Sequence, residues 1–440
     1  MFKIIISNLW RRRRQNLWLF IELIIVSILT WVIADPTLVK LYDVRSEQGY
    51  DTDRTVFIEM GIVPFKSAKF DNEAWTPDGM THHHEIILSR LKNMPDVENA
   101  ARIYNVLGGD SFSFVPTITE WQKNDSTFNW TPFLRVYRNS DFFNVYGIEA
   151  AEGYPSIKDV EANSLSDNDI VITETLDREV WGDRPGLKDK YFLVLLDRGD
   201  YVDTIRNNVV GVVKDFHINS FMRTKMNIIQ LSAFDPADLQ LPPKIIVRLK
   251  EGIDAGRFAT EHLENISDML RIGNLYVKSV CSQKAFLSKT EAIRGVTSSL
   301  NLSIIVACLF LINLILGVVG CVWLQTGKRV KEVGVLRSYG AMRKNIVGML
   351  IGESVVMATI AVIIGCVIYL QYALKEGLSN GVINNDTVMQ QHSWVTDFGC
   401  HFATVSAVVY ALIIICVVIG TFFPARHVSR VEPVDALRDE

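Results

Sequence analysis

Residues 300–324 read LNLSIIVACLFLINLILGVVGCVWL, residues 325–345 read QTGKRVKEVGVLRSYGAMRKN, and a second apolar run follows over residues 346–372. Each apolar run is long enough to cross a bilayer core of ~30 Å as a helix that rises ~1.5 Å per residue. The segment between them carries six Lys or Arg residues and a single acid, Glu332. Such a basic excess in a short loop is typical of the cytoplasmic side of a membrane. The stretch therefore predicts two membrane helices joined by a cytoplasmic hinge.

The rest of the chain is arranged around this pair. The chain has 440 residues, 49% hydrophobic content and a formal net charge of −4, so its apolar residues must be concentrated in segments. Residues 17–34 and 398–423 are two further apolar runs near spanning length. Residues 35–295 have ordinary globular composition, and about 260 residues are enough for one large domain or two small ones. The predicted fold class is a membrane protein with four transmembrane α-helices and a large α+β extracytoplasmic domain.

Basic residues beside the spans predict the orientation. Arg11–Arg14 precede the first span, and Arg426, Arg430 and Arg438 follow the last, whereas the loop 373–397 has one Lys or Arg, Lys375. Both termini, an amphipathic segment 1–16 and a tail 424–440, are therefore expected in the cytoplasm, with the large domain outside the plasma (inner) membrane. The alternative for the first span is a cleaved signal peptide, but its apolar run exceeds the 7–15 residues usual for such a segment.

The large domain contains two β-α-β patterns, one at each end. The first has strands at 54–62 and 97–107 around a helix at 82–94, and the second has strands at 244–249 and 274–280 around a helix at 254–271. They predict one split subdomain, residues 45–112 and 208–282, which includes a buried strand at 208–216. A second subdomain, residues 113–207, is expected as an insertion, with strands at 133–137, 169–173 and 191–196 and a helix at 174–181.

A stalk over residues 283–299 connects this domain to the second span. Between Gln283 and Leu324 there is no proline, and Gly295 is the only glycine before Gly317. One continuous helix is favoured, because an isolated glycine only mildly weakens a helix. The alternative is a break near Gly295 or at residues 297–299.

Motifs for catalysis are weak. The only Gly-Lys pair, Gly327-Lys328, lacks the glycine five residues earlier that a phosphate-binding loop requires. His82–His84 point in different directions on a helix and are expected at the surface rather than at a metal. Asp215 and His217 are more plausible as turn residues than as an acid and base. No catalytic residue or metal site is predicted, and with Cys281 alone in the outer domain no disulfide framework is expected there.

Two acids lie inside predicted spans. Glu22 is in the first span and Glu353 in the third, where an ionised side chain is costly unless it faces protein or reaches the interface. They serve either in packing or proton relay, or sit near the cytoplasmic interface within reach of Arg14 or Arg343.

The hinge and the tail carry a family resemblance. Residues 332–345, EVGVLRSYGAMRKN, and the tail 424–438, PARHVSRVEPVDALR, resemble the coupling helix and C-terminal signature of FtsX/MacB-like ABC transporter permeases. Residues 133–153, 170–174 and 210–216 resemble the extracytoplasmic domain of that family. The resemblance covers nearly the whole chain. One departure is that the first span has no glycine, whereas family members often carry small residues there, which bears on the dimer interface.

The resemblance implies one transmembrane subunit of a type VII ABC transporter that forms a dimer with a second copy or a paralogue. ATP and Mg²⁺ would bind a separate cytoplasmic ATPase, so this chain would hold no cofactor and would not itself be an enzyme. Two sets of residues would meet that ATPase. The coupling set is Glu332, Gly334, Arg337, Gly340 and Ala341, and the C-terminal set is Pro424, Ala425, Arg426, Pro433, Ala436, Leu437 and Arg438. The alternative for the loop is anchoring to lipid headgroups by its cations.

Two functions remain open from the sequence. The first is efflux or extraction of envelope substrates such as lipoproteins, peptides or drugs, driven by movements transmitted to the outer domain (mechanotransmission). The second is a non-transporting signal transmitter of the FtsX type that regulates an extracytoplasmic partner such as a cell-wall hydrolase. A periplasmic adaptor or lipoprotein is a further possible partner, membrane lipids surround the spans, and no nucleic acid is expected. A membrane-anchored enzyme is the least favoured class.

Overall fold

A computed structural model of the protein describes residues 13–109, 113–118, 129–164, 166–182, 186–197, 202–219, 225–235, 238, 241–327, 330–379 and 393–430. The described residues fall into two compact units. The membrane unit lies within Met1–Tyr42, Thr297–Gly381 and His392–Glu440, and the α/β unit lies within Asp43–Val296 and Val382–Gln391. Residues 1–12 of the predicted N-terminal segment 1–16 and most of the external loop 373–397 lie outside the described residues.

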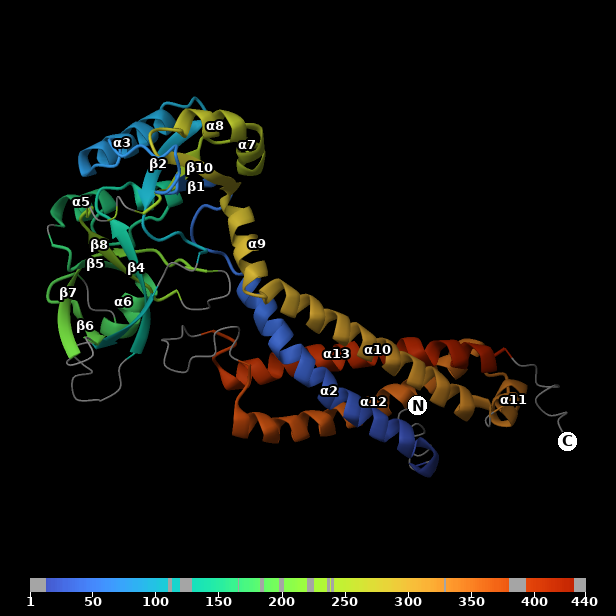
Figure 1. The fold of residues 1–440 in the computed structure, drawn as a ribbon. Coiled ribbons are helices and arrows are strands. Elements are labelled where there is room, and N and C mark those ends of the chain that lie inside the picture. The colour runs from blue at the N-terminus through green and yellow to red at the C-terminus, as the bar shows by residue number, and fades with distance from the viewer. Residues whose placement is uncertain are drawn as a thin grey trace. The chain divides into compact units, whose positions relative to one another are not determined.

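Four long helices form the membrane unit (Figure 1). They are α2 (Arg13–Arg45), α10 (Val296–Gly327), α12 (Arg343–Glu376) and α13 (Phe398–Val428), and each is long and apolar enough to cross a membrane. The predicted fold class is thus confirmed. The predicted end of the first span at Ala34 is not where the helix ends, because α2 continues through Asp35 and Pro36 to Arg45. Asp35 does not stop the helix because its carboxylate is buried against a partner on α13.

Glycines on three helices allow the bundle to pack closely. A Cβ at Gly317 of α10 would lie 2.0 Å from the Glu22 carboxylate of α2, and one at Gly365 of α12 would lie 2.6 Å from the Ser27 hydroxyl of α2. A Cβ at Gly420 of α13 would lie 2.9 Å from Val318 of α10. Close packing against α2, which has no glycine, is therefore made by glycines of its neighbours.

The α/β unit contains a four-stranded antiparallel sheet in the order β10-β1-β9-β2. Its strands are β1 (Thr55–Ile62), β2 (Val97–Ile103), β9 (Lys244–Leu249) and β10 (Leu275–Ser282), and α3 (Pro77–Lys92), α7 (Ala255–Glu261) and α8 (Leu263–Leu270) pack against it. Ile87 and Leu91 of α3 meet Ile266 and Leu270 of α8 in this core. The two predicted β-α-β patterns are found, although the second predicted helix is divided at His262.

The insertion between β2 and β9 is a closed barrel in the order β3-β4-β8-β5-β7-β6. Its strands are β3 (Ser113–Ile118), β4 (Asn129–Tyr137), β5 (Asp169–Thr173), β6 (Tyr191–Asp197), β7 (Val202–Val213) and β8 (Ile228–Ser232). Three short helices accompany them, α4 (Phe142–Tyr146), α5 (Ile157–Asn163) and α6 (Glu174–Trp181).

The predicted boundary at residue 207 is wrong. β7 pairs with β5 and β6, and β8 pairs with β4 and β5, so residues 208–213 and 228–232 belong to the barrel and not to the split subdomain. A buried apolar strand carries no signal of which sheet it joins, because both faces of either sheet can bury it. Phe57 and Ile246 of the sheet share a core with Leu134 and Ile229 of the barrel.

The stalk helix is interrupted. α9 (Gln283–Ile293) ends at Arg294, Gly295 has a φ of +72°, and α10 begins at Val296. The favoured expectation of one continuous helix is therefore wrong, and the alternative break near Gly295 is the one observed. A positive φ is accessible to glycine at little cost, which is why the chain can leave helical geometry at this position.

Candidate functional site

The hinge predicted to couple to a partner forms a short helix with a defined end. α11 (Val330–Ser338) is followed by Gly340, whose φ is +88°. The Gly340 N–H donates to the Arg337 carbonyl at 2.9 Å, and the Ala341 N–H donates to the Leu336 carbonyl at 3.0 Å. These two bonds make a Schellman motif, in which a residue with positive φ closes a helix. Gly340 thus fixes the turn between α11 and α12.

One side of α11 is anchored in the membrane unit. Val333 is 2% exposed and packs with Ile346 and Leu350 of α12 and with Ala425 and Val428 of α13. Gly334 is buried beside it, as expected where backbones approach closely. α11 is therefore held in place by two membrane helices.

α11 and the turn that follows it also expose large apolar side chains. Val335 and Leu336 are exposed on α11, Tyr339 is 87% exposed, and Met342 is 68% exposed. Glu332, Gly340, Arg343 and Lys344 are also exposed, and Arg337 and Ala341 are half-buried. We call Val335, Leu336, Tyr339 and Met342 the α11 apolar surface. None of these four was among the predicted site residues, although four large apolar residues in a basic loop were a signal.

The C-terminal set divides into buried and exposed positions. Pro424 and Ala425 are buried in α13, and Ala425 lies in the same cluster as Val333. The partner contact predicted for both residues stays a prediction, and Ala425 packs with Val333 of α11 in this structure. Arg426 is exposed and lies over the Phe422 ring at 5.9 Å. Pro433, Ala436, Leu437 and Arg438 lie outside the described residues.

The two predicted intramembrane acids face protein. Glu353 of α12 is 5% exposed, and the half-buried Glu22 packs against Gly317 of α10. Burial within the bundle is the arrangement expected for acids in a membrane span.

A third intramembrane acid was missed. The His401 Nε2 of α13 lies 2.8 Å from the Asp35 Oδ1 of α2, and both residues are buried. The other ring nitrogen of His401 is 2.9 Å from the Val395 carbonyl, and the Ser379 N–H donates to Asp35 Oδ2 at 3.1 Å. Stacked Trp31, Tyr369 and Phe402 rings lie nearby. The two residues are 366 positions apart in the sequence, so no local pattern indicates that they are in contact.

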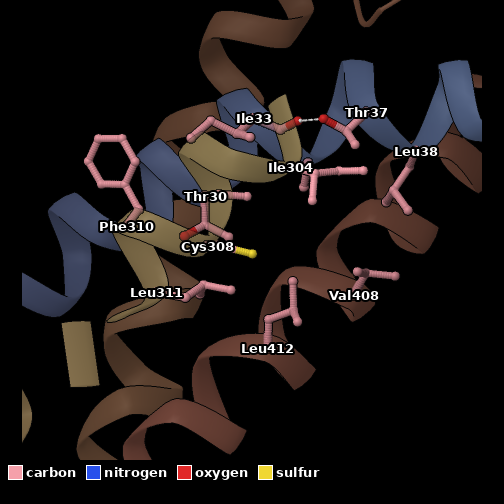
Figure 2. A pocket seen from close by; sticks show the side chains of 12 residues that line it. Thr30, Ile33, Thr37, Leu38, Ile304, Cys308, Phe310, Leu311, Val408 and Leu412 are labelled. Atoms are coloured by element: carbon pink, nitrogen blue, oxygen red, sulfur yellow. Dashed lines mark hydrogen bonds between the residues drawn. The ribbon is translucent and has the colours of Figure 1, made fainter. Parts of the chain in front are cut away.

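An apolar pocket of about 230 Å³ lies between α2, α10 and α13 (Figure 2). Figure 2 shows Ile33 and Leu38 of α2, Cys308 and Leu311 of α10, and Leu412 of α13 around it. The Thr37 hydroxyl, which could otherwise serve a ligand, donates to the Ile33 carbonyl at 2.6 Å. Apart from the Cys308 thiol and the Thr30 and Thr37 hydroxyls, the wall consists of apolar side chains that offer van der Waals contact.

The weaker candidates in the α/β unit have structural partners. Asp215 Oδ1 accepts from the Thr175 N–H at 2.9 Å at the start of α6, whereas His217 lies 3.4 Å from the Ser46 hydroxyl. They make separate contacts and so do not act as an acid and base pair. His84 is buried, contrary to the expected surface position, and its Nδ1 lies 2.6 Å from an Arg102 nitrogen. Within the described ranges, no group of three or more potential metal ligands is found.

Comparison with known proteins bears on the same segments. Residues 304–433, which contain α11 and the start of the tail, match the family model of the FtsX-like permease C-terminal domain. The macrolide export ATP-binding/permease protein MacB of Agrobacterium fabrum is 22% identical over 308 residues, which cover 68% of this chain and 42% of that protein. The MacB of Bdellovibrio bacteriovorus is 26% identical over 147 residues, 33% of this chain and 20% of that protein. The chain thus spans less than half the length of these relatives.

Two solved structures are also similar. The periplasmic region of MacB from Actinobacillus actinomycetemcomitans has 10% identity and a TM-score of 0.30, covering 56% of this chain and 96% of that one. A domain of a putative permease protein from Porphyromonas gingivalis has 17% identity and a TM-score of 0.30, covering 52% and 91%. The family assignment rests on the sequence matches, which include the hinge and tail where the resemblance was strongest. Residues 304–433 thus match the FtsX-like permease C-terminal domain, and together with the MacB matches they support an FtsX/MacB-like ABC permease.

Proposed function

We propose that this chain is the permease subunit of an ATP-driven transporter and that the α11 apolar surface docks on a cytoplasmic ABC ATPase. In this proposal ATP and Mg²⁺ bind the ATPase, a second permease copy or paralogue completes the dimer, and both termini of this chain are cytoplasmic. Hydrolysis moves α11, and the movement reaches the α/β unit through α10 and α9, which follow one another along the chain.

The proposal rests on one observation, which is that α11 is anchored in the membrane unit and yet exposes large apolar side chains. Val333 fixes α11 to α12 and α13, while Leu336 on α11 and Tyr339 and Met342 in the turn after it are exposed. Large apolar residues that stay exposed on an anchored helix indicate a protein interaction site. Because α11 is fixed to two membrane helices, force on its exposed side has a direct route into the bundle.

The proposed substrates are envelope molecules that are exported or extracted. The two curated relatives are named as macrolide export proteins, so apolar organic compounds are one class, and lipoproteins and peptides are others. The α/β unit, with both a sheet subdomain and a barrel, favours transport over signalling because it offers a large surface for a substrate. A regulator of a cell-wall hydrolase remains the competing function.

Affinity purification of the full chain from native membranes in mild detergent tests the proposal. We expect a soluble ATPase to co-purify and ATP hydrolysis to accompany it. Co-purified lipoprotein or pump components would support transport, whereas a hydrolase would favour signalling. If no ATPase is recovered even after cross-linking at residues 332–341, the proposal that this chain is a permease subunit is wrong.

Matched variants separate docking from lipid anchoring. Gly340→Asp and Arg337→Glu are expected to reduce the recovered ATPase about tenfold, a change of ~1.4 kcal/mol in association, while the protein stays in the membrane. Gly340→Asn is the control for the turn, because asparagine tolerates positive φ better than other side chains. Lys344→Glu is the control for charge. Equal losses for Arg337→Glu and Lys344→Glu would indicate headgroup binding by cations, and normal recovery with both Gly340→Asp and Arg337→Glu would contradict docking.

A further inference from the structure

A second pocket, of about 360 Å³, lies where the sheet and the barrel of the α/β unit meet. Arg102, Tyr104 and Asn105 at the end of β2 line it, with Tyr137 at the end of β4 and residues 241–244 leading into β9. We call it the junction pocket. Its volume is within the range of pockets that hold small organic ligands.

The Arg102 guanidinium in this pocket is held in a fixed orientation. One terminal nitrogen is 2.6 Å from His84 Nδ1, and the other donates to the Asp238 carbonyl at 3.1 Å. The Phe234 and Tyr137 rings lie at 4.2 Å and 5.3 Å from its central carbon. Together with a side-chain hydrogen bond to Tyr137, these contacts use three of the five guanidinium N–H groups within the described part of the chain. Further donors can therefore face the pocket.

His84 acts as a neutral acceptor for Arg102. Its burial, the Arg102 charge and His83 together lower the pKa of His84 to about 3. At neutral pH the ring is uncharged, so its Nδ1 can accept a hydrogen bond from the guanidinium without repelling it. This gives a role to one of the three consecutive histidines in the sequence.

Cations outnumber acids around the junction pocket. Arg102 and Lys244 line it, and Arg135 lies behind it with its guanidinium 3.5 Å from the Asp238 carboxylate. Asp238 is the only acid among the described residues that line the pocket. Glu59 does not line the pocket, but its charge interacts with Lys244. Its carboxylate also forms an ion pair with Lys278 at 2.6 Å. The remaining positive charge suits an anion.

The rest of the lining is apolar or aromatic. Ile103, Leu241, Pro242 and Pro243 form one part of the wall, and the Tyr104 and Tyr137 rings form another. Rings and prolines bury a flat apolar body with little loss of side-chain entropy. The guanidinium is planar and binds carboxylate or phosphate oxygens in pairs.

We propose that the junction pocket binds an organic anion in which a carboxylate or phosphate group is attached to an aromatic or apolar body. The anionic group meets Arg102, with Lys244 nearby, and the body lies against Tyr104, Tyr137 and Pro242. The site is built from the α/β unit alone, so it does not depend on the ATPase docking proposed above.

Ligand binding to the full-length protein in detergent tests this site by isothermal titration calorimetry. The probes are benzoate, phenyl phosphate and the neutral benzamide, which has a similar size. We expect benzoate or phenyl phosphate to bind at least tenfold more tightly than benzamide. Whichever anion binds more tightly identifies the anionic group that the site prefers.

Three variants connect the binding to the pocket. Arg102→Gln is expected to weaken binding of the preferred anion at least tenfold. Leu241→Trp, at an exposed position on the rim, is expected to block the pocket without removing a charge, and it provides the test should Arg102→Gln fail to fold. Arg178→Gln is the matched control, because that arginine is exposed on α6 and pairs only locally with Glu174 among the described residues.

Two results would overturn the proposal. Equal binding of benzamide and the anions would show partition into apolar surface rather than recognition of charge. Unchanged anion binding in folded Arg102→Gln or in Leu241→Trp would place the bound anion elsewhere.

Discussion

At the scale of single residues, Glu161 is a half-buried acid with no counter-charge among the described residues. It lies on α5, and its Oε1 is buried with no hydrogen-bond partner among the described residues. Burial, and to a lesser extent the nearby Asp141 carboxylate, raise the pKa of Glu161 from its usual 4.5 to about 7. The folded chain therefore keeps a proton between these values that the unfolded chain has lost.

The sign of the resulting pH dependence follows directly. The contribution of Glu161 to stability is intact below pH ~4.5, falls as the pH rises towards 7, and stays lower above that. We expect Glu161→Gln to raise the unfolding temperature of the full-length protein at pH 8 and to leave it unchanged near pH 4.5. Thermal unfolding over that pH range measures the effect. Glu264→Gln on the exposed face of α8 is the control, and an equal gain in both variants would contradict the assignment.

Residue-level patterns predicted Gly340 better than His84. A glycine between a basic amphipathic segment and an apolar run indicates a turn, and Gly340 indeed closes α11 with a positive φ. His84 was expected at the surface, but it is buried, and its Nδ1 contacts Arg102, which is 18 residues later in the chain. Local sequence does not contain that contact.

At the scale of elements, a buried contact between a carboxyl group and an imidazole ring connects α2 and α13. Asp35 and His401 lie 2.8 Å apart, and neither is accessible to solvent. Loss of one partner of a buried pair leaves the other without compensation and typically costs about 3–5 kcal/mol. We expect Asp35→Asn and His401→Gln each to destabilise the membrane unit by about 3 kcal/mol, and the double variant to lose less than the sum of the two.

Equilibrium unfolding in mixed micelles measures these differences as a double-mutant cycle. Tyr410→Phe is the control, because it removes an exposed hydroxyl that contacts Thr359 at 3.2 Å on the same helix bundle. Strict additivity of the Asp35 and His401 effects would mean that the contact adds nothing to the association of the helices.

The order of elements was predictable, but their ends and partners were less so. The positions of the four spans followed from apolar length, yet α2 extends to Arg45 because the Asp35 side chain finds a buried partner. The stalk breaks at Gly295 although a single glycine is tolerated in many helices. Likewise β7 joins the barrel because β5 and β6 pair with it, and strand composition alone does not select a partner.

At the scale of the whole molecule, the orientation in the membrane remains a prediction from charge. We expect the α11 loop to face the cytoplasm and the α/β unit to face outward, because Lys and Arg are enriched beside the proposed cytoplasmic ends. With the six native cysteines replaced, single cysteines at Ser338 and Lys158 provide the probes, since both positions are exposed.

Labelling with a membrane-impermeant maleimide in spheroplasts measures the orientation. Lys158→Cys should react in intact spheroplasts, and Ser338→Cys should react only after permeabilisation. The reverse pattern would exclude docking of α11 on a cytoplasmic ATPase. Reaction of a cysteine at the exposed Lys66 of the α/β unit in intact spheroplasts is the positive control.

The sequence by itself determined the four membrane spans, the order of the α/β elements and the family resemblance, because apolar length, periodicity and short motifs are local properties of the chain. The tertiary structure decided which strands close the barrel, which glycines pack against α2 and where the stalk breaks. It also decided that Tyr339 and Met342 are exposed at the hinge whereas Ala425 is buried. It also brought together Asp35 with His401 and His84 with Arg102. These features depend on contacts between residues distant in the chain, and the free energy of such contacts is set by burial and geometry that exist only after folding.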